Sequence, residues 1–241
     1  MRLCYNNNCQ LIQRMVVVFM DKKTIQKRRT MRYFIDAAYQ IIEEKGIDNI
    51  TIRDVADIAG YNSATLYNYF ENLDHLIFFT SLKYLKNYVQ DLNNYTKDSK
   101  NALDKFIKIW ECFCKHSLSN PKIYYNIFFG KYSNSLNNDI KEYYSIFPEE
   151  LGEQQEDIMV MLLGQNMYER NLAILKSCAN EGFIKKENIV DINEMVVSIY
   201  QGMISRILNN GNDYDVEDLK DKIMKYIKQV IISFEGNIFA D

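Results

Sequence analysis

Residues 63–69 carry the side chains whose types and spacing best fit recognition chemistry. Hydroxyl and amide groups hydrogen-bond base edges and phosphates, methyl groups of alanine and threonine meet thymine methyls, and tyrosine hydroxyls reach phosphate oxygens. The residues of these types are Ser63, Ala64, Thr65, Tyr67, Asn68 and Tyr69. Positions i and i+2 of a helix lie about 200° apart, so one of the two tyrosines is expected to pack and the other to meet solvent or DNA.

A basic run precedes this segment. Six cations and no acid fall between residues 22 and 33, whereas the whole chain has 29 Lys and Arg against 32 Asp and Glu. Positive charge is therefore local, and each phosphate that the run contacts would add about −0.9 to the salt slope of DNA binding. A solvated tail is the alternative interpretation, because terminal lysine clusters are common. The cations are Lys22, Lys23, Lys27, Arg28, Arg29 and Arg32, with Arg53 as a further candidate.

Two short helices and the longer helix before them must position these side chains. Apolar residues at positions 34, 37, 38, 41 and 42 predict an amphipathic helix that ends at Gly46. Thr51 is suited to cap the second helix, and Asp54 stands three residues later, at the capping-box position. Gly60 falls in the next turn, where a positive φ is cheapest for glycine. This spacing is typical of a helix-turn-helix.

The segment from Thr51 to Phe70 resembles the DNA-binding domain of the TetR (tetracycline-repressor) family. The resemblance extends from Arg29 to Ile77. It implies a cytoplasmic, homodimeric transcription regulator, usually a repressor, whose C-terminal domain binds a small molecule and dimerises through its last two long helices. By motif position it also implies that Thr51 and the polar residues of 63–69 face DNA. Leu73 departs from the pattern, because many members have a phosphate-binding lysine there.

The chain beyond residue 77 is expected to be helical. Its 241 residues include only two Pro and nine Gly, too few for a β-sandwich with a turn every 8–12 residues or so. The predicted fold class is therefore all-α: a disordered leader at 1–19, a basic arm and three-helix DNA-binding domain at 20–77, and a larger effector-binding and dimerisation domain at 78–241. Apolar stripes predict later helices over 76–95, 103–114, 121–129, 158–179 (with a bend at Gly164), 192–207 and 216–234.

Aromatic residues gather in the middle helices, where the resemblance implies an effector cavity. By residue type alone, such side chains are more often core than cavity lining. If they line a cavity, they favour a flat or hydrophobic effector. The predicted effector-binding residues are Phe106, Trp110, Phe113, Tyr124, Tyr125, Phe128, Phe129 and Tyr168.

The last two predicted helices have wide apolar stripes that need a covering surface. They either form core within one chain or supply half of a four-helix dimer interface, and the resemblance favours the dimer. Small residues at positions 202 and 205 would permit close helix approach. The predicted interface residues are Met195, Ile199, Gly202, Met203, Ile223, Ile227, Val230 and Phe234.

The sequence carries no motif for catalysis, metal binding or membrane insertion. It lacks G-x-G-x-x-G, G-x-x-x-x-G-K, H-E-x-x-H and G-x-S-x-G. Cys112 and Cys114 face different sides of a helix, so His116 nearby does not complete a metal site. The five Cys are expected to be free thiols. The apolar run from Met15 to Met20 is too short to span a membrane. We expect no enzyme activity, no cofactor, no metal and no membrane partner.

These observations predict a cytoplasmic regulator that binds operator DNA as a homodimer and is released by a small hydrophobic or aromatic effector. One alternative is a helical partner-binding protein with a vestigial helix-turn-helix. The absence of Lys and Arg from residues 63–70 and the presence of Leu73 favour that alternative. Another is an enzyme with a helical cavity, because an active site need not leave a linear motif.

Overall fold

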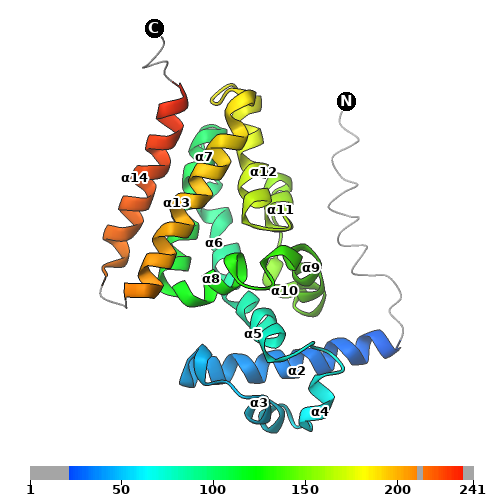
Figure 1. Cartoon of the computed structure of the whole chain (residues 1–241). Helices are drawn as coiled ribbons and strands as arrows, with labels where there is room; N and C mark the ends of the chain where they lie inside the picture. The colour runs from blue at the N-terminus through cyan, green and yellow to red at the C-terminus, as the bar shows by residue number, and fades with distance from the viewer. Residues whose placement is uncertain (1–21, 211–213, 236–241) are drawn as a thin grey trace. The chain divides into compact units, whose positions relative to one another are not determined.

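The computed structural model describes residues 22–210 and 214–235, and every regular element within these ranges is a helix (Figure 1). The chain divides into two compact units. The first unit comprises Met1–Thr80 and Lys141–Glu149, and the second comprises Ser81–Ile140 and Glu150–Asp241. The predicted leader at 1–19 lies outside the described residues. The all-α fold class predicted from the sequence is confirmed within the described ranges.

The first helix, α2, is longer than the apolar pattern indicated. It spans Lys22–Lys45, so the basic run forms the first turns of this helix. No Gly or Pro interrupts it, and it buries a continuous apolar stripe that includes Phe34 and Ile41. Gly46 follows with a φ of 80°, as expected for a glycine that ends a helix. The predicted arm is thus an extension of the first helix.

The remaining helices of the first unit are short. They are η1 (Ile47–Asn49), α3 (Ile52–Ala59), α4 (Ser63–Leu66) and α5 (Leu73–Ser81), whose final residue belongs to the second unit. The carboxyl half of α9 (Leu136–Ile146) also belongs to the first unit, together with the start of α10 (Pro148–Leu151).

The second unit is a bundle of longer helices. In chain order its elements are η2 (Leu82–Tyr84), α6 (Leu85–Thr96), α7 (Ala102–Ser119), α8 (Pro121–Phe129), η3 (Ser133–Ser135), α11 (Glu156–Leu162), α12 (Met167–Asn180), η4 (Lys186–Asn188), α13 (Ile189–Asn210) and α14 (Val216–Glu235).

Two stretches expected as single helices are each divided in two. The stretch 76–95 becomes α5 and α6 with the turn η2 between them, and 158–179 becomes α11 and α12. Asn166 restarts the chain as the N-cap of α12, because its side chain accepts a hydrogen bond from the backbone N–H of Glu169 (3.0 Å). Apolar periodicity continues through both breaks, so periodicity alone did not reveal them.

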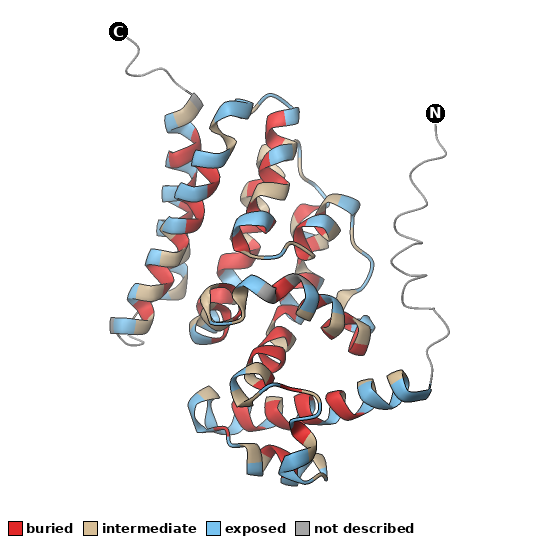
Figure 2. Cartoon of the chain, turned by 45° about the vertical axis from the view of Figure 1, so that its right-hand side comes forward, coloured by how far each residue is buried: buried red, intermediate tan, exposed pale blue. Residues whose placement is uncertain are grey.

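Helices α13 and α14 bury one side and expose the other, whereas α7 is buried or half-buried at every residue except Lys115 and Ser119 (Figure 2). Helix α14 packs against both α7 and α13, and α12 packs against α7 and α13 (Figure 1). Burying such stripes against one another is the main source of stability for a helical bundle. No described helix is long and apolar enough to cross a membrane.

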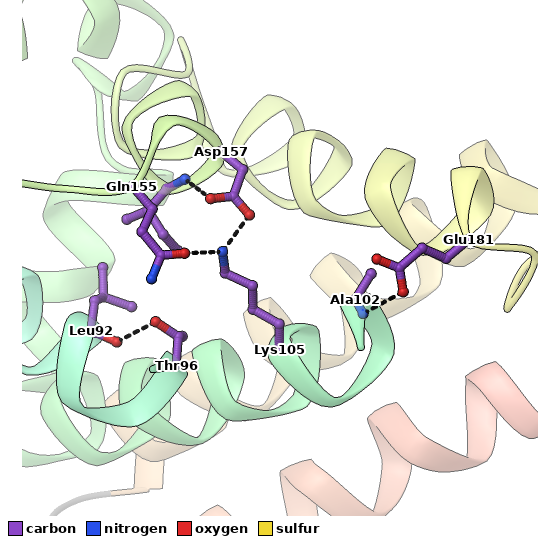
Figure 3. A network of polar contacts seen from close by, with 8 residues as sticks. Leu92, Thr96, Ala102, Lys105, Gln155, Asp157 and Glu181 are labelled. Atoms are coloured by element: carbon purple, nitrogen blue, oxygen red, sulfur yellow. Dashed lines mark hydrogen bonds and ion pairs between the residues drawn. The ribbon is translucent and has the colours of Figure 1, made fainter. Parts of the chain in front are cut away.

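Polar contacts tie the ends of helices together in this unit (Figure 3). Lys105 on α7 donates to the side chain of Gln155 (2.8 Å) and pairs with Asp157 (2.5 Å) at the start of α11. In the same first turn of α7, the carboxylate of Glu181 accepts from the backbone N–H of Ala102, the first residue of the helix (2.8 Å). A carboxylate at a helix N-terminus satisfies an N–H group that has no partner within the helix.

Candidate nucleic-acid interface

The helix-turn-helix of the first unit is fixed by caps at both helices. Thr51 accepts a hydrogen bond from the backbone N–H of Asp54 (3.2 Å) and so caps α3, as its residue type predicted. Gly60 ends that helix in the left-handed region, with a φ of 76°. Asn62 then caps α4, because its side-chain oxygen accepts from the backbone N–H of Thr65 (2.9 Å). These contacts turn the chain sharply between the two helices.

Apolar side chains hold α4 and the turn after it against α2 and α3. Leu66 and Phe70 are buried. The ring of Phe34 on α2 lies 5.2 Å from that of Tyr61 and 6.2 Å from that of Tyr69. Aromatic packing of this kind fixes the angle at which a short helix leaves the core. Although α4 is only one turn long, these contacts therefore fix its orientation.

The polar residues predicted to face DNA lie mainly on the outer side of this element. Ser63, Ala64, Tyr67 and Asn68 are exposed. Tyr67 is 55 % exposed, whereas Tyr69 is half-buried against Phe34, so Tyr69 is the tyrosine that packs. One ring packs and the other is exposed, as predicted, but α4 ends at Leu66 and both tyrosines lie in the turn after it, so helical spacing is not the cause.

The hydroxyl groups of Thr51 and Thr65 differ in the hydrogen bonds that they could still form with DNA. The Thr51 oxygen accepts from a backbone N–H, which leaves its own hydrogen available to donate to a phosphate. The Thr65 hydroxyl donates to the side-chain oxygen of Asn62 (2.9 Å), which leaves it as an acceptor or a methyl contact. Arg53 is highly exposed and lies 4.0 Å from Asp57 in a weak surface pair.

The cations of α2 fall into two groups. Lys22, Lys23 and Arg29 are exposed, whereas Arg28 is half-buried. Lys27 forms an ion pair with Glu142 of α9 (2.7 Å). Lys22, Lys23 and Arg29 are thus available to contact a phosphate, whereas Lys27, although exposed, would first have to leave Glu142.

Comparison with known proteins bears on this same region. Residues 34–78 match the family model described as bacterial regulatory proteins, tetR family. The helix-turn-helix region of this chain is therefore similar to that of the tetR family. A curated relative, an HTH-type transcriptional regulator from Haemophilus influenzae described as uncharacterized, is 36 % identical over 55 residues. That match covers 22 % of this chain and spans about a quarter (27 %) of the relative.

Solved structures of the tetR family share the fold along most of the chain. FadR from Thermus thermophilus, solved with lauroyl-CoA, covers 88 % of this chain and 100 % of its own, with a TM-score of 0.57 at 12 % identity. FadR from Bacillus subtilis, solved with stearoyl-CoA, covers 81 % of this chain and 96 % of its own, with a TM-score of 0.51 at 17 % identity. At these identities the likeness shows the fold alone.

A cluster centred on Arg32, which we call the α2 clasp, joins α2 to residues 142–149. Its members are Lys27, Arg32, Glu142, Phe147 and Glu149, and all of them lie in the first unit. Arg32 donates to the backbone carbonyl of Ile146 (2.8 Å), pairs with Glu149 (2.5 Å) and lies 4.4 Å above the ring of Phe147. Sequence reasoning counted Arg32 only as part of the basic run, and no local signal links it to a segment more than a hundred residues away.

Half of the predicted effector-binding residues line one small cavity in the second unit. The other four do not line the cavity: Tyr124 is buried, Tyr125 and Phe129 are half-buried, and Tyr168 is 39 % exposed. The four predicted residues in the wall are Phe106, Trp110, Phe113 and Phe128.

The predicted dimer residues also separate into two groups. Ile223, Ile227 and Val230 of α14 and Met203 of α13 are buried within the protomer, so they supply its own core. A partner would instead meet the outer side of α13 and the end of α14, where Met195 and Gly202 are exposed and Ile199 and Phe234 are half-buried. Helical periodicity identified the apolar residues. It did not show which of them are buried by other helices of the same chain.

The residues weighed as a metal site face other partners. His116 Nε2 lies 3.0 Å from a carboxylate oxygen of Asp91. Burial raises the pKa of the Cys112 thiol to about 12 and also raises the pKa of Cys114. No group of three or more His, Cys, Asp or Glu is placed to hold a metal ion within residues 22–210 and 214–235.

Proposed function

We propose that this chain regulates transcription by binding a near-palindromic operator as a homodimer, and that a small hydrophobic effector releases it. One observation carries the proposal: within the helix-turn-helix, Leu66 and Phe70 are buried while Ser63, Ala64, Tyr67 and Asn68 are exposed. The second helix of such a motif lies in the major groove, where side chains of these types meet base edges. Repression is the mode that we propose.

The chemistry of the exposed residues points to A·T-rich half-sites. Asn68 can bond the N6 and N7 atoms of adenine, and the methyl group of Ala64 can contact that of thymine. The paired donors that Arg or Lys presents to guanine are absent from residues 63–70. The two half-sites would lie about 34–36 Å apart, or a multiple of that distance, on one face of the duplex.

Phosphate contacts would come from the flanks of the motif. Thr51 caps α3 and Arg53 lies in its first turn, and Lys22, Lys23 and Arg29 are exposed near the start of α2. Replacing these three α2 cations with glutamine should make the salt slope less negative by about 2.7 per protomer, because each phosphate that a cation neutralises accounts for about 0.9 of the slope. An unchanged slope would show that the start of α2 does not touch DNA.

The effector would bind among the middle helices of the second unit. The aromatic wall formed by Phe106, Trp110, Phe113 and Phe128 supports a hydrophobic ligand. The lauroyl-CoA bound to FadR from Thermus thermophilus shows that a protein of this fold can take such a ligand. To act as a switch, the effector must bind the conformation that does not fit the operator more tightly, typically by about 1–3 kcal/mol. The protein would act in the cytoplasm and would catalyse no reaction.

Fluorescence anisotropy with DNA from upstream of the chain's own gene tests the proposal. We expect a preference of about 10³ or more over a scrambled duplex at about 0.15 M salt. The double variant Ser63→Glu, Asn68→Glu should abolish this preference, because two carboxylates would face the DNA. Ser119→Glu with Asn94→Glu is the matched control, since it adds the same charges at exposed positions of the second unit. Equal binding to both duplexes would contradict the proposal.

A helical partner-binding protein with a vestigial helix-turn-helix is the second candidate. The absence of Lys and Arg from residues 63–70 and the replacement of a phosphate-binding lysine by Leu73 favour it. The Ser63→Glu, Asn68→Glu variant separates the two candidates in cells. It should relieve regulation under the first candidate and leave the protein's activity intact under the second.

A further inference from the structure

The cavity among the middle helices has a polar end as well as an aromatic wall. Its volume is about 30 Å³, which is on the scale of a single water molecule. Most of its wall is apolar. The lining residues come from α6, α7, α8, α11 and α12 of the second unit, and they are Tyr88, Phe106, Ile109, Trp110, Phe113, Phe128, Met161, Met167, Arg170, Asn171 and Ile174.

Arg170 gives this wall a permanent positive charge. The residue is only 4 % exposed, and one terminal nitrogen of its guanidinium group donates to the backbone carbonyl of Leu162. The central guanidinium carbon lies 5.2 Å from the ring centre of Phe128. Arginine stays charged at every pH at which a protein is folded. The eleven lining residues therefore include one cation and no Asp or Glu.

The turn between α11 and α12 is shaped around Arg170. A Cβ atom on Gly164 would lie 2.9 Å from Cγ of Arg170 and 3.0 Å from its backbone nitrogen, closer than side chains normally approach. Glycine at this position lets the start of α12 pack tightly against the turn. The side chain of Arg170 is thus held at the cavity by its surroundings.

Asn171 adds an amide of fixed orientation beside Arg170. Its Oδ1 accepts from the indole N–H of Trp110 (2.8 Å), and its Nδ2 donates to Oδ1 of Asn193 (2.8 Å). Asn193 donates in turn to the backbone carbonyl of Tyr168 (3.1 Å). An amide nitrogen carries two hydrogens, so Asn171 retains one N–H beyond this chain of bonds.

We propose that the effector is a carboxylate with an apolar body, with its carboxylate at Arg170 and Asn171 and its body against the aromatic wall. This proposal rests on the effector site proposed above and specifies its ligand class. A planar guanidinium group matches a carboxylate with two parallel hydrogen bonds, and the low polarity of the wall strengthens that pair. A neutral hydrophobic ligand could not form such paired, charge-assisted hydrogen bonds with the guanidinium group.

Binding must move side chains, because the cavity is smaller than any such ligand. Met161 and Met167 line it, and methionine changes rotamer more readily than the aromatic residues around it. They flank the turn that carries Gly164, at the end of α11 and the start of α12. Ligand binding is therefore coupled to the α11–α12 turn.

Trp110 provides the test, since it is the only tryptophan in the chain and lies in the cavity wall. Its fluorescence is followed while wild-type protein is titrated with benzoate, phenylacetate, octanoate and laurate, each beside its neutral amide, and with lauroyl-CoA. We expect at least one carboxylate to bind about tenfold or more tighter than its amide, as charge-assisted hydrogen bonds require. Binding of no carboxylate, equal binding of acid and amide, or tighter binding of lauroyl-CoA than of laurate would overturn the proposal.

Variants test the part played by Arg170 itself. Arg170→Met replaces the cation with an unbranched apolar side chain. The variant should fold, because replacing a buried ion with a hydrophobic residue often leaves the free energy of unfolding unchanged. It should remove the preference for the acid, whereas Arg170→Lys should keep part of it. Lys176→Met is the matched control, since it removes one positive charge from an exposed position of the same helix. An acid preference that survives in Arg170→Met would contradict the assignment, and circular dichroism checks that each variant is folded.

The outcome can be separated from that of the regulator proposal by adding operator DNA. Carboxylate binding at Trp110 without any sequence-specific DNA binding would support this site and contradict the regulator. Specific DNA binding with no response of Trp110 fluorescence to any carboxylate would support the regulator and contradict the carboxylate site. Release of DNA by the same carboxylates, lost in Arg170→Met, would support both.

Discussion

At the scale of single residues, the helix-turn-helix uses the same side chains for local structure and for its exposed surface. Thr51 is exposed, yet its oxygen also closes the first turn of α3. Thr65 is half-buried, and its backbone N–H and hydroxyl both bond to Asn62. A substitution at either position therefore changes stability and binding together, and a binding measurement alone would not separate the two effects.

Thr51→Ala should lower the free energy of unfolding of the first unit by about 1 kcal/mol, because it removes the cap of α3. Thr51→Ser keeps the capping oxygen and should recover most of that loss. Chemical denaturation followed by circular dichroism measures the difference. Equal stability of Thr51→Ala and wild type would show that this hydrogen bond does not stabilise α3.

His116 gives the second unit a dependence on pH. Burial lowers the pKa of its imidazole, which outweighs the opposing effect of the Asp91 carboxylate 3.0 Å away. The unfolded chain therefore binds a proton at a higher pH than the folded chain does, and the free energy of unfolding should fall as the pH drops through about 6.5. His116→Gln should fall less steeply in that range. A steeper fall in the variant than in wild type would contradict this assignment.

At the scale of elements, the α2 clasp shows how one helix can contact two parts of the chain that lie far apart in the sequence. The middle of α2 packs on the helix-turn-helix through Phe34. Its amino part contacts residues 142–149 through Lys27 and Arg32. Residues 141–149, which lie in the sequence between helices of the second unit, thus belong to the first unit.

Arg32→Ala should destabilise the first unit by about 1–2 kcal/mol, because it removes a hydrogen bond, a partly screened ion pair and a cation–π contact. Hydrogen exchange should rise in peptides from residues 22–33 and 141–149. Arg29→Ala is the control, since Arg29 is an exposed cation of the same helix. Equal exchange in the two variants would show that Arg32 does not hold the segment.

At the scale of the whole molecule, the proposed regulator depends on two copies of the chain. The outer side of α13 presents Met195 at 44 % exposure, and an added Cβ at Gly202 would meet open space. A second α13 can approach closely over a glycine. The dimer surface that we propose therefore runs along Met195, Ile199 and Gly202.

Ile199→Glu should weaken the dimer by about 30-fold or more, because a carboxylate in the centre of an interface costs about 2 kcal/mol or more. Operator affinity should fall with it, since a monomer contacts only one half-site. Val160→Glu is the matched control, because Val160 is exposed (59 %) on α11. Analytical ultracentrifugation measures the assembly, and a variant that dimerises like wild type would place the interface elsewhere.

The sequence by itself determined the features that depend on neighbours within four residues. Thr51 as a cap, Gly60 at a positive φ and Pro121 at the first turn of α8 all follow from local hydrogen bonding and steric preference. The all-α class followed from periodicity and the scarcity of Gly and Pro. The exposed polar residues of the helix-turn-helix followed from its spacing.

Only the tertiary structure decided which distant segments meet. Nothing local to Arg32 indicates Phe147. The sequence suggested a bend at Gly164, but nothing in residues 158–179 indicated a full break between two helices there or the burial of Arg170. The same holds for α14, where Ile223 and Ile227 are covered by the chain's own helices. An apolar stripe predicts that one face of a helix will be buried. It does not predict which helix covers that face, because the hydrophobic effect is non-directional and the packing of the whole chain decides the contact.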